Sequence, residues 1–548
     1  MRATRTAPTA RCLVVAPRGN ARISICRETE ARNERDPLSG ERLRSVEPTP
    51  VHQASVAKRS TTALLWSAGG AIAKIAAQLL VQVTLARILD PHTFGEFAIL
   101  MALVGLSGVV TNCGFGSALI QKSELVASDV GLALGWSLLI ALGLTVVISL
   151  AAPGIAELFG DPGLVWMLRA IAVALIPLTL ANLYSSLLHR ELRMKSIQII
   201  HVIAYTIVFG GVATTLALRG WKGWSLVIAY AAQVIFTLSA TYAICRYPLR
   251  PRLSGDRRLV HFGLKSLATE LANWSIENAD RFLVGRFWGL NQLGLYSVAF
   301  NLSKAPAGLM VYAVQNIAFA SAARLQDDAA AVRKGLLVVL SAVALVSLPA
   351  FTLVSLESTT VLRVVYGTKW LDAAPYMAAL ALAIPLISLG TISAAILRGM
   401  GSVGAEFRVQ FVTAAAFLGG VIILSTRSLA LAVWIVPLAY LGRLTWLLTL
   451  LRKRLGLGIA DILETFRGPL VLAAVGVGVA TMARILPGAT ALGMGVLPIV
   501  FACLAVASLL VARFSWFLGD SLTAIVRERL SEGRFGPFVV WLASRGTH

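Results

Sequence analysis

The chain has 548 residues, of which 57% are hydrophobic and only 14% are charged, and its mean hydropathy is +0.76. A soluble protein is about 25% charged, so this composition excludes a soluble enzyme and indicates a membrane protein that crosses the bilayer many times. The formal net charge of +22 does not require nucleic acid as a partner, because Lys and Arg gather in alternate short loops, as the positive-inside rule expects.

Residues 1–60 differ in kind from the rest of the chain. They are rich in Arg, Glu, Pro and Ser and contain no apolar run long enough for a signal peptide. We expect a disordered basic tail. No methionine occurs between Met1 and Met101, so a start codon chosen too far upstream is one explanation of this tail. A regulatory tail that touches anionic lipid is the other.

Runs of about 20 apolar residues, the length that crosses a bilayer as a helix, recur along the chain. They predict an all-α polytopic membrane protein with about fourteen transmembrane helices. The predicted spans are residues 61–86, 93–112, 130–152, 163–187, 197–218, 223–245, 262–287, 293–320, 334–356, 373–397, 406–425, 428–451, 468–486 and 490–513.

We expect these spans to form two six-helix lobes followed by two C-terminal helices. The predicted parts are an N-terminal lobe (61–245), a cytoplasmic linker (246–261), a C-terminal lobe (262–451), helices 13 and 14 (468–513) and a cytoplasmic amphipathic tail (514–548). Basic residues, including the cluster from Arg246 to Arg258, are more frequent in the loops that lie inside when both termini are cytoplasmic. The positive-inside rule therefore predicts cytoplasmic N and C termini.

The first half of the chain resembles the second half. A shift of 199 residues places Arg87 on Arg286 and Gly95 on Gly294. Six spans separate the two copies, and an even number preserves orientation. The repeats are therefore predicted to be parallel, which is typical of transporters with two bundles facing a central cavity.

One predicted span carries far more polar residues than a lipid-facing helix allows. Within residues 263–287 the polar positions recur at intervals of three, four and seven, so they share one helical face; they are Ser266, Glu270, Asn273, Glu277, Asp280 and Arg281. Ionisable groups at bilayer depth usually line a water-filled path or a binding site. The alternative is internal neutralisation, for example of Glu277 by Arg281 four residues later.

Two lysines on other spans have no acid near them on the same span. Lys74 shares its face with Gln78, and Lys304 precedes Gln315 on span eight. Unpaired cations in a cavity of low dielectric attract anions strongly. The sequence therefore predicts a cationic substrate cavity between the two lobes.

Several classes of function are not supported by any motif. There is no P-loop, the five cysteines and six histidines lack metal-binding spacing, and no Ser/His/Asp arrangement stands out. We therefore expect no catalytic residues, no metal and no cofactor, and a carrier rather than an enzyme. A membrane polysaccharide polymerase or ligase is less favoured, because it would need a large external loop to seat its catalytic groups.

Four segments resemble the Wzx-type oligosaccharide flippases of the multidrug/oligosaccharidyl-lipid/polysaccharide flippase superfamily, and most closely the colanic-acid-exporter-like polysaccharide transporters. They are residues 85–97, 188–195, 279–300 and 366–375. The resemblance implies two six-helix lobes in a V. It also implies transport of an undecaprenyl-pyrophosphate-linked oligosaccharide across the bacterial inner membrane for O-antigen, capsule or exopolysaccharide biosynthesis.

The resemblance further implies roles for the polar residues described above. The cationic side chains would contact phosphate or glycan, the amides would bind sugar hydroxyls, and the acids are candidates for coupling-ion contacts. The cationic residues are Lys74, Arg281 and Lys304. The amides are Gln78, Asn273 and Gln315, and the acids are Glu270, Glu277 and Asp280. Membrane lipids, a polysaccharide polymerase and export machinery are the implied partners. The rival within transport is a drug or cation antiporter of the same superfamily, which would be expected to have a more acidic cavity.

Overall fold

The computed structural model describes residues 69–70, 73–112, 115–116, 119, 127–247, 250–253 and 257–485. Within these ranges the chain is helical and contains no β-strand. The predicted N-terminal tail, the fourteenth span and the C-terminal tail lie outside the described residues.

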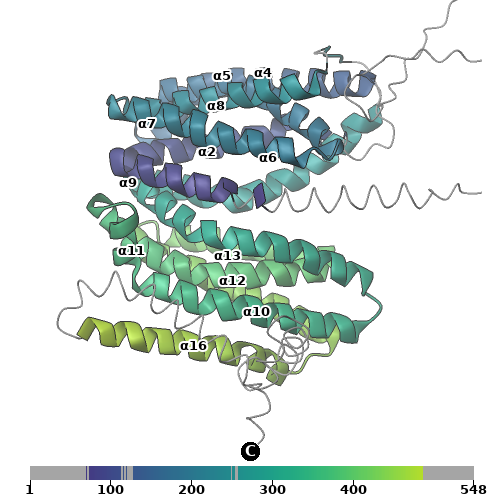
Figure 1. The fold of residues 1–548 in the computed structure, drawn as a ribbon, viewed down its shortest axis with the longest axis vertical. Coiled ribbons are helices and arrows are strands. Elements are labelled where there is room, and N and C mark those ends of the chain that lie inside the picture. Colours follow the sequence, from purple (N-terminus) through teal and green to yellow (C-terminus); the bar gives the residue numbers. More distant parts are fainter. Residues whose placement is uncertain are drawn as a thin grey trace, which may run out of the picture.

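The helices of the first half gather in one group (Figure 1). It begins with the helical residues 73–88 and continues with α2 (Pro91–Asn112), α4 (Ala127–Phe159), α5 (Leu164–Arg190), α6 (Met194–Ile203), η1 (Ala204–Phe209), α7 (Gly210–Leu218) and α8 (Lys222–Cys245). The segment η1 is π-helical and joins α6 to α7 without interruption, so residues 194–218 form one span.

The helices of the second half gather in the other group, and α9 (Arg257–Arg324) lies between the two (Figure 1). The second group comprises α10 (Ala329–Leu356), α11 (Ser358–Val365), η2 (Thr368–Ala373), α12 (Ala374–Gly399), α13 (Val403–Ile423), α14 (Leu429–Ala432), α15 (Ile435–Leu455) and α16 (Ile459–Ile485). The two groups have the arrangement expected of two lobes, although the predicted lobe boundaries stay a prediction.

This architecture confirms an all-α polytopic fold. Ten helical segments in the described residues are long and apolar enough to cross a membrane, and each begins or ends within a few residues of a predicted span. The helix α9 is not among these ten. It covers the seventh and eighth predicted spans, and its helical geometry breaks at Gly289, where φ is +83°. A residue with a side chain rarely adopts such a φ, which is why glycine suits the break.

The lobes share a hydrophobic core at the end of the molecule where Gly289 lies. One cluster of buried side chains joins α2, α4 and α5 of the first lobe to α9, η2 and α12 of the second, and includes Leu100, Leu168, Leu293 and Trp370. Away from this end the described cores are separate, because one contains only residues of 115–187 and another only residues of 318–457. The lobes are therefore joined at the Gly289 end, which faces outside in the predicted orientation.

Candidate functional site

The acidic end of the predicted polar face on α9 is buried and hydrogen-bonded. Asp280 is 7% exposed, and its Oδ2 accepts a hydrogen bond of 2.7 Å from the hydroxyl of Tyr296. Its Oδ1 accepts a second bond, of 2.9 Å, from the backbone N–H of Arg281. Because Asp280 and Tyr296 lie on opposite sides of the break at Gly289, this pair holds the two halves of α9 together. Tyr296 was not predicted as a site residue.

Two of the three predicted cationic residues meet at one aromatic ring. The guanidinium carbon of Arg281 lies 6.0 Å from the ring centroid of Phe300, and the ammonium of Lys304 lies 5.3 Å from it. Among the described residues neither cation forms an ion pair, and the side chain of Arg281 donates only a long hydrogen bond, 3.4 Å, to Asn278. Both cations are close enough to Asp280 to interact with its charge.

The depth of these cations makes them candidates for substrate contact. At a rise of about 1.5 Å per residue, Arg281 and Lys304 lie about 12 Å and about 22 Å along the two halves of α9 from Gly289. A hydrocarbon core is about 30 Å thick, so both residues lie at membrane depth. Cations at that depth face a site or a bundle interior rather than lipid.

A further cation, which the sequence reasoning missed, lies on α15. Arg443 is 9% exposed, its Nε has no hydrogen-bond partner among the described residues, and its guanidinium carbon lies 5.9 Å from the ring centroid of Tyr440. Tyr440 in turn lies within electrostatic range of Tyr296. The available signal was an arginine inside the apolar span 428–451 with no acid on that span.

The structure does not bring Lys74 to the Phe300 ring within the contacts it describes. Lys74 is half-buried in the helical residues 73–88, close enough to His201 of α6 for their charges to interact. Gln78 follows one turn later and is also half-buried. Both residues belong to the first lobe, so a shared site with Arg281 and Lys304 would have to span the two lobes.

The remaining predicted residues lie on α9. Gln315 is half-buried near the end of this helix. Glu270, Asn273 and Glu277 belong to its helical backbone, but their side chains lie outside the described part. Their roles therefore stay predictions.

At the Gly289 end, hydrogen bonds reach from one lobe to the other. The Nε1–H of the buried Trp370 donates to the carbonyl of Ala86 at 2.7 Å, and the Lys369 ammonium donates to the carbonyls of Arg87 and Leu89 at 2.8 and 2.7 Å. The Arg87 guanidinium donates back to the carbonyls of Val364 and Val365 at 2.8 and 3.2 Å. These contacts close the outer end in the predicted orientation.

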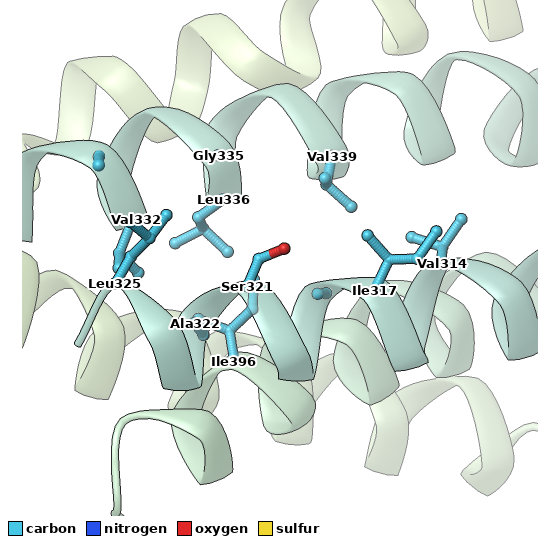
Figure 2. Close-up of a pocket in the computed structure, with 12 residues that line it drawn as sticks. Val314, Ile317, Ser321, Ala322, Leu325, Val332, Gly335, Leu336, Val339 and Ile396 are labelled. Carbon is cyan, nitrogen blue, oxygen red and sulfur yellow. The ribbon is translucent and has the colours of Figure 1, made fainter. Parts of the chain in front are cut away.

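Figure 2 shows a pocket that is distinct from these polar residues. It has a volume of about 280 Å³ and lies between the end of α9 and the start of α10, and Ser321 is the only polar side chain among its lining residues. None of the predicted site residues lines it. An apolar wall of this kind does not suit a charged head group.

Known proteins with similar sequences are named for polysaccharide biosynthesis. The lipopolysaccharide biosynthesis protein WzxC of Escherichia coli (strain K12) is 23% identical over 378 residues, which cover 67% of this chain and 76% of WzxC. The succinoglycan biosynthesis transport protein ExoT of Rhizobium meliloti (strain 1021) is 29% identical over 346 residues, 62% of this chain and 68% of ExoT. The teichuronic acid biosynthesis protein TuaB of Bacillus subtilis (strain 168) is 25% identical over 282 residues, which cover 50% of this chain and 57% of TuaB.

Solved structures of membrane transporters share the fold. The lipid II flippase MurJ in an inward closed conformation matches with a TM-score of 0.65 and 13% identity, covering 81% of this chain and 98% of MurJ. An inward-facing multidrug resistance MATE transporter matches with a TM-score of 0.52 and 15% identity, covering 70% of this chain and 98% of the MATE transporter.

These relatives and folds agree with the expected class of transporter rather than enzyme. The sequence profile of a family described as polysaccharide biosynthesis protein matches residues 84–375, more than half of the chain. The resemblance noted in the sequence is thereby confirmed, and the chain belongs to the polysaccharide biosynthesis protein family.

Proposed function

We propose that this chain is a flippase that moves an undecaprenyl-pyrophosphate-linked oligosaccharide from the inner to the outer leaflet of the bacterial inner membrane. The observation that carries the proposal is the pair of cations, Arg281 and Lys304, that shares the Phe300 ring at membrane depth without an ion-pair partner among the described residues. A pyrophosphate is an anion that such a pair suits. The family and the names of the relatives support a glycan as the rest of the cargo.

The physical need for such a protein is the cost of desolvation. A pyrophosphate and several sugars would lose their hydrogen bonds to water in hydrocarbon, and each unsatisfied polar group costs several kcal/mol there. In the proposed mechanism the head group passes between the lobes while the lipid tail stays in the bilayer. Arg281 and Lys304 would bind phosphate, with Lys74 on the opposite lobe, and Gln78, Asn273 and Gln315 would bind sugar hydroxyls.

Transport would proceed by alternating access, with the two lobes rocking about the central site. The hydrogen bonds of Trp370, Lys369 and Arg87 at the Gly289 end support a state that is closed outside and receives the head group from the cytoplasm. Both termini would then be cytoplasmic. Glu270, Glu277 and Asp280 are proposed contacts for a coupling proton or sodium ion, and a polymerase and export machinery are proposed partners on the outer side.

The test is flipping of a fluorescent polyprenyl-pyrophosphate oligosaccharide in proteoliposomes. Hydrogen bonds to charged groups contribute about 1.5–3 kcal/mol each, so Lys304→Ala and Arg281→Ala should each lower the rate by about tenfold or more. Lys74→Ala tests the contribution of the other lobe. The matched control is Lys334→Ala, which removes an exposed lysine of α10.

Each outcome decides a different part of the proposal. If Lys304→Ala and Arg281→Ala both flip at the wild-type rate, the assignment of the cationic site is wrong. If the wild type moves no lipid-linked glycan but carries small cations against a gradient, the function is that of an antiporter.

A further inference from the structure

One imidazole and two carboxylates meet where α2 begins, beside the turn that joins α4 to α5. His92 Nδ1 lies 3.9 Å from Glu96 Oε1, and His92 Nε2 lies 3.7 Å from Asp161 Oδ2. One ligand atom from each of the three residues lies within 4.8 Å of the other two. No metal-binding motif marks this place in the sequence, because Asp161 comes from a distant turn and only the fold brings it to His92 and Glu96.

One carboxylate oxygen of this cluster has no hydrogen-bond partner among the described residues. Asp161 Oδ1 accepts a hydrogen bond of 2.8 Å from the backbone N–H of Gly163, but its Oδ2 is buried and has no hydrogen-bond partner among the described residues. Glu96 is 8% exposed and faces Asp161. Ionised carboxylates that face each other with little access to water repel, so an arrangement of this kind is stable only with a proton or a cation between them.

The carboxylates around the cluster outnumber the permanent cations. Besides Asp161, the groups within electrostatic range of Glu96 are the carboxylate of Asp90 and the ammonium of Lys222, and the ammonium of Lys369 lies near Asp90. Three carboxylates therefore share two ammonium groups, and a proton on His92 or a bound cation would complete the balance. A wall of backbone also encloses the site, because a Cβ added at Gly223 of α8 would lie 2.5 Å from Glu96 Oε2. Glu96 therefore has no room to turn further toward α8.

We propose that His92, Glu96 and Asp161 form a binding site for a divalent cation, and that Zn²⁺ is the ion that fits it best. One imidazole nitrogen with two carboxylate oxygens is a ligand set that zinc accepts, with a fourth position left to water. The side chain of His92 is 50% exposed, so the ion has a route in from solvent.

The position of the site gives the ion a mechanical effect. A bound cation would tie the first turn of α2 to the turn between α4 and α5. The same part of α2 carries Pro91 and Gly95, which touch α9 of the other lobe. Occupancy would therefore fix, within the first lobe, the turn of α2 that contacts the other lobe at the Gly289 end. This inference does not depend on the identity of the transported substrate.

The experiment measures zinc in the purified full-length chain, carrying an affinity tag without histidine. The protein is stripped with a chelator, given one equivalent of Zn²⁺, desalted and analysed for metal content and for the midpoint of thermal unfolding. The wild type should retain about one zinc per chain and unfold at a higher temperature with zinc than without. Glu96→Gln and Asp161→Asn should lose both effects.

The controls separate this site from other ligands in the chain. His201→Gln and Asp372→Asn remove a histidine and an exposed carboxylate outside the cluster and should bind zinc as the wild type does. Because His92 is half-exposed, His92→Gln should fold even if the carboxylate variants do not, and it should lose zinc. The proposal is wrong if the wild type retains no zinc, or if folded His92→Gln retains as much as the wild type.

Discussion

Gly95 and Gly294 are reciprocal contacts at the crossing of α2 and α9. A Cβ added at Gly95 would lie 1.9 Å from the carbonyl oxygen of Leu290, and one added at Gly294 would lie 1.8 Å from the carbonyl oxygen of Pro91. Leu290 follows Pro91 by 199 residues, the same shift that relates Gly294 to Gly95. The two repeats therefore meet through equivalent positions, as two parallel repeats related by a two-fold axis would.

Alanine at either glycine should open or weaken this crossing, since the atom that a Cβ would meet is backbone and cannot move aside. Overpacking of this kind costs about 1–3 kcal/mol. We expect Gly95→Ala and Gly294→Ala each to lower the midpoint of thermal unfolding and to slow lipid flipping severalfold. Gly211→Ala is the matched control, because a Cβ there meets nothing within 4 Å. Equal unfolding midpoints for all three variants would contradict the close crossing of α2 and α9.

Loss of the indole donor of Trp370 should open the contact between the lobes at the Gly289 end. Trp370→Phe keeps a buried ring but leaves the carbonyl of Ala86 without its 2.7 Å hydrogen bond, at a cost of about 1–3 kcal/mol. Spin labels at positions 166 and 431 report the separation of the lobes at this end, because Trp166 and Leu431 are 64% and 58% exposed. We expect the distance distribution to gain a longer component in the variant.

A second variant checks that the shift comes from the hydrogen bond between lobes. Trp288→Phe removes an indole that donates to the carbonyl of Arg427, a residue of the same lobe. It should leave the label distance unchanged. A longer component in both variants would mean that the labels report general loosening rather than release of the contact between the lobes.

The sequence predicted the long helices because a helix that crosses the bilayer needs an unbroken run of about 20 apolar residues. Such a run can be recognised locally, without knowledge of the tertiary structure. It also predicted the break in α9, since the spans 262–287 and 293–320 leave a gap that contains Gly289. The short helices α11 and η2 were not predicted. Their residues are too few and too mixed in polarity to give a membrane signal. The position of Trp370 depends on its hydrogen bond to Ala86 of the other lobe, which the local sequence does not show.

The same contrast holds for the candidate site. Arg281 and Lys304 were predicted from polarity at bilayer depth, and their common partner Phe300 lies on the same helix as Lys304. The bond between Tyr296 and Asp280 could not be predicted, because it depends on how sharply the chain folds back at Gly289. Arg443 was missed because the sequence does not distinguish a single arginine at membrane depth from one near the end of a span.

Removing the hydroxyl of Tyr296 should lower the thermal stability of the protein, because the buried Asp280 loses a hydrogen-bond donor. Tyr296→Phe preserves the ring and deletes a 2.7 Å hydrogen bond to a carboxylate that is 7% exposed. A lost bond to a buried charged group costs about 1.5–3 kcal/mol, so thermal stability should fall. Asp280→Asn in the same background should recover part of the loss, since an amide is less costly to bury than a carboxylate. Simple additivity of the two changes in a double-mutant cycle would contradict the pairing.

Arg443 should be more important for transport than for stability. Its Nε is buried with no hydrogen-bond partner among the described residues, and the carboxylate within its electrostatic range, Glu406, is already paired with Arg398 at 2.9 Å. A buried charge that is only partly compensated destabilises a fold. Arg443→Met keeps most of the side-chain volume and removes that charge, so we expect an equal or higher unfolding midpoint together with flipping slowed by about tenfold or more. Arg408→Met, which replaces an exposed arginine of α13, should change neither. If Arg443→Met destabilises the protein and leaves the flipping rate of the remaining folded protein intact, Arg443 is a structural residue that the lobe needs for packing, and the cationic site is confined to α9 and Lys74.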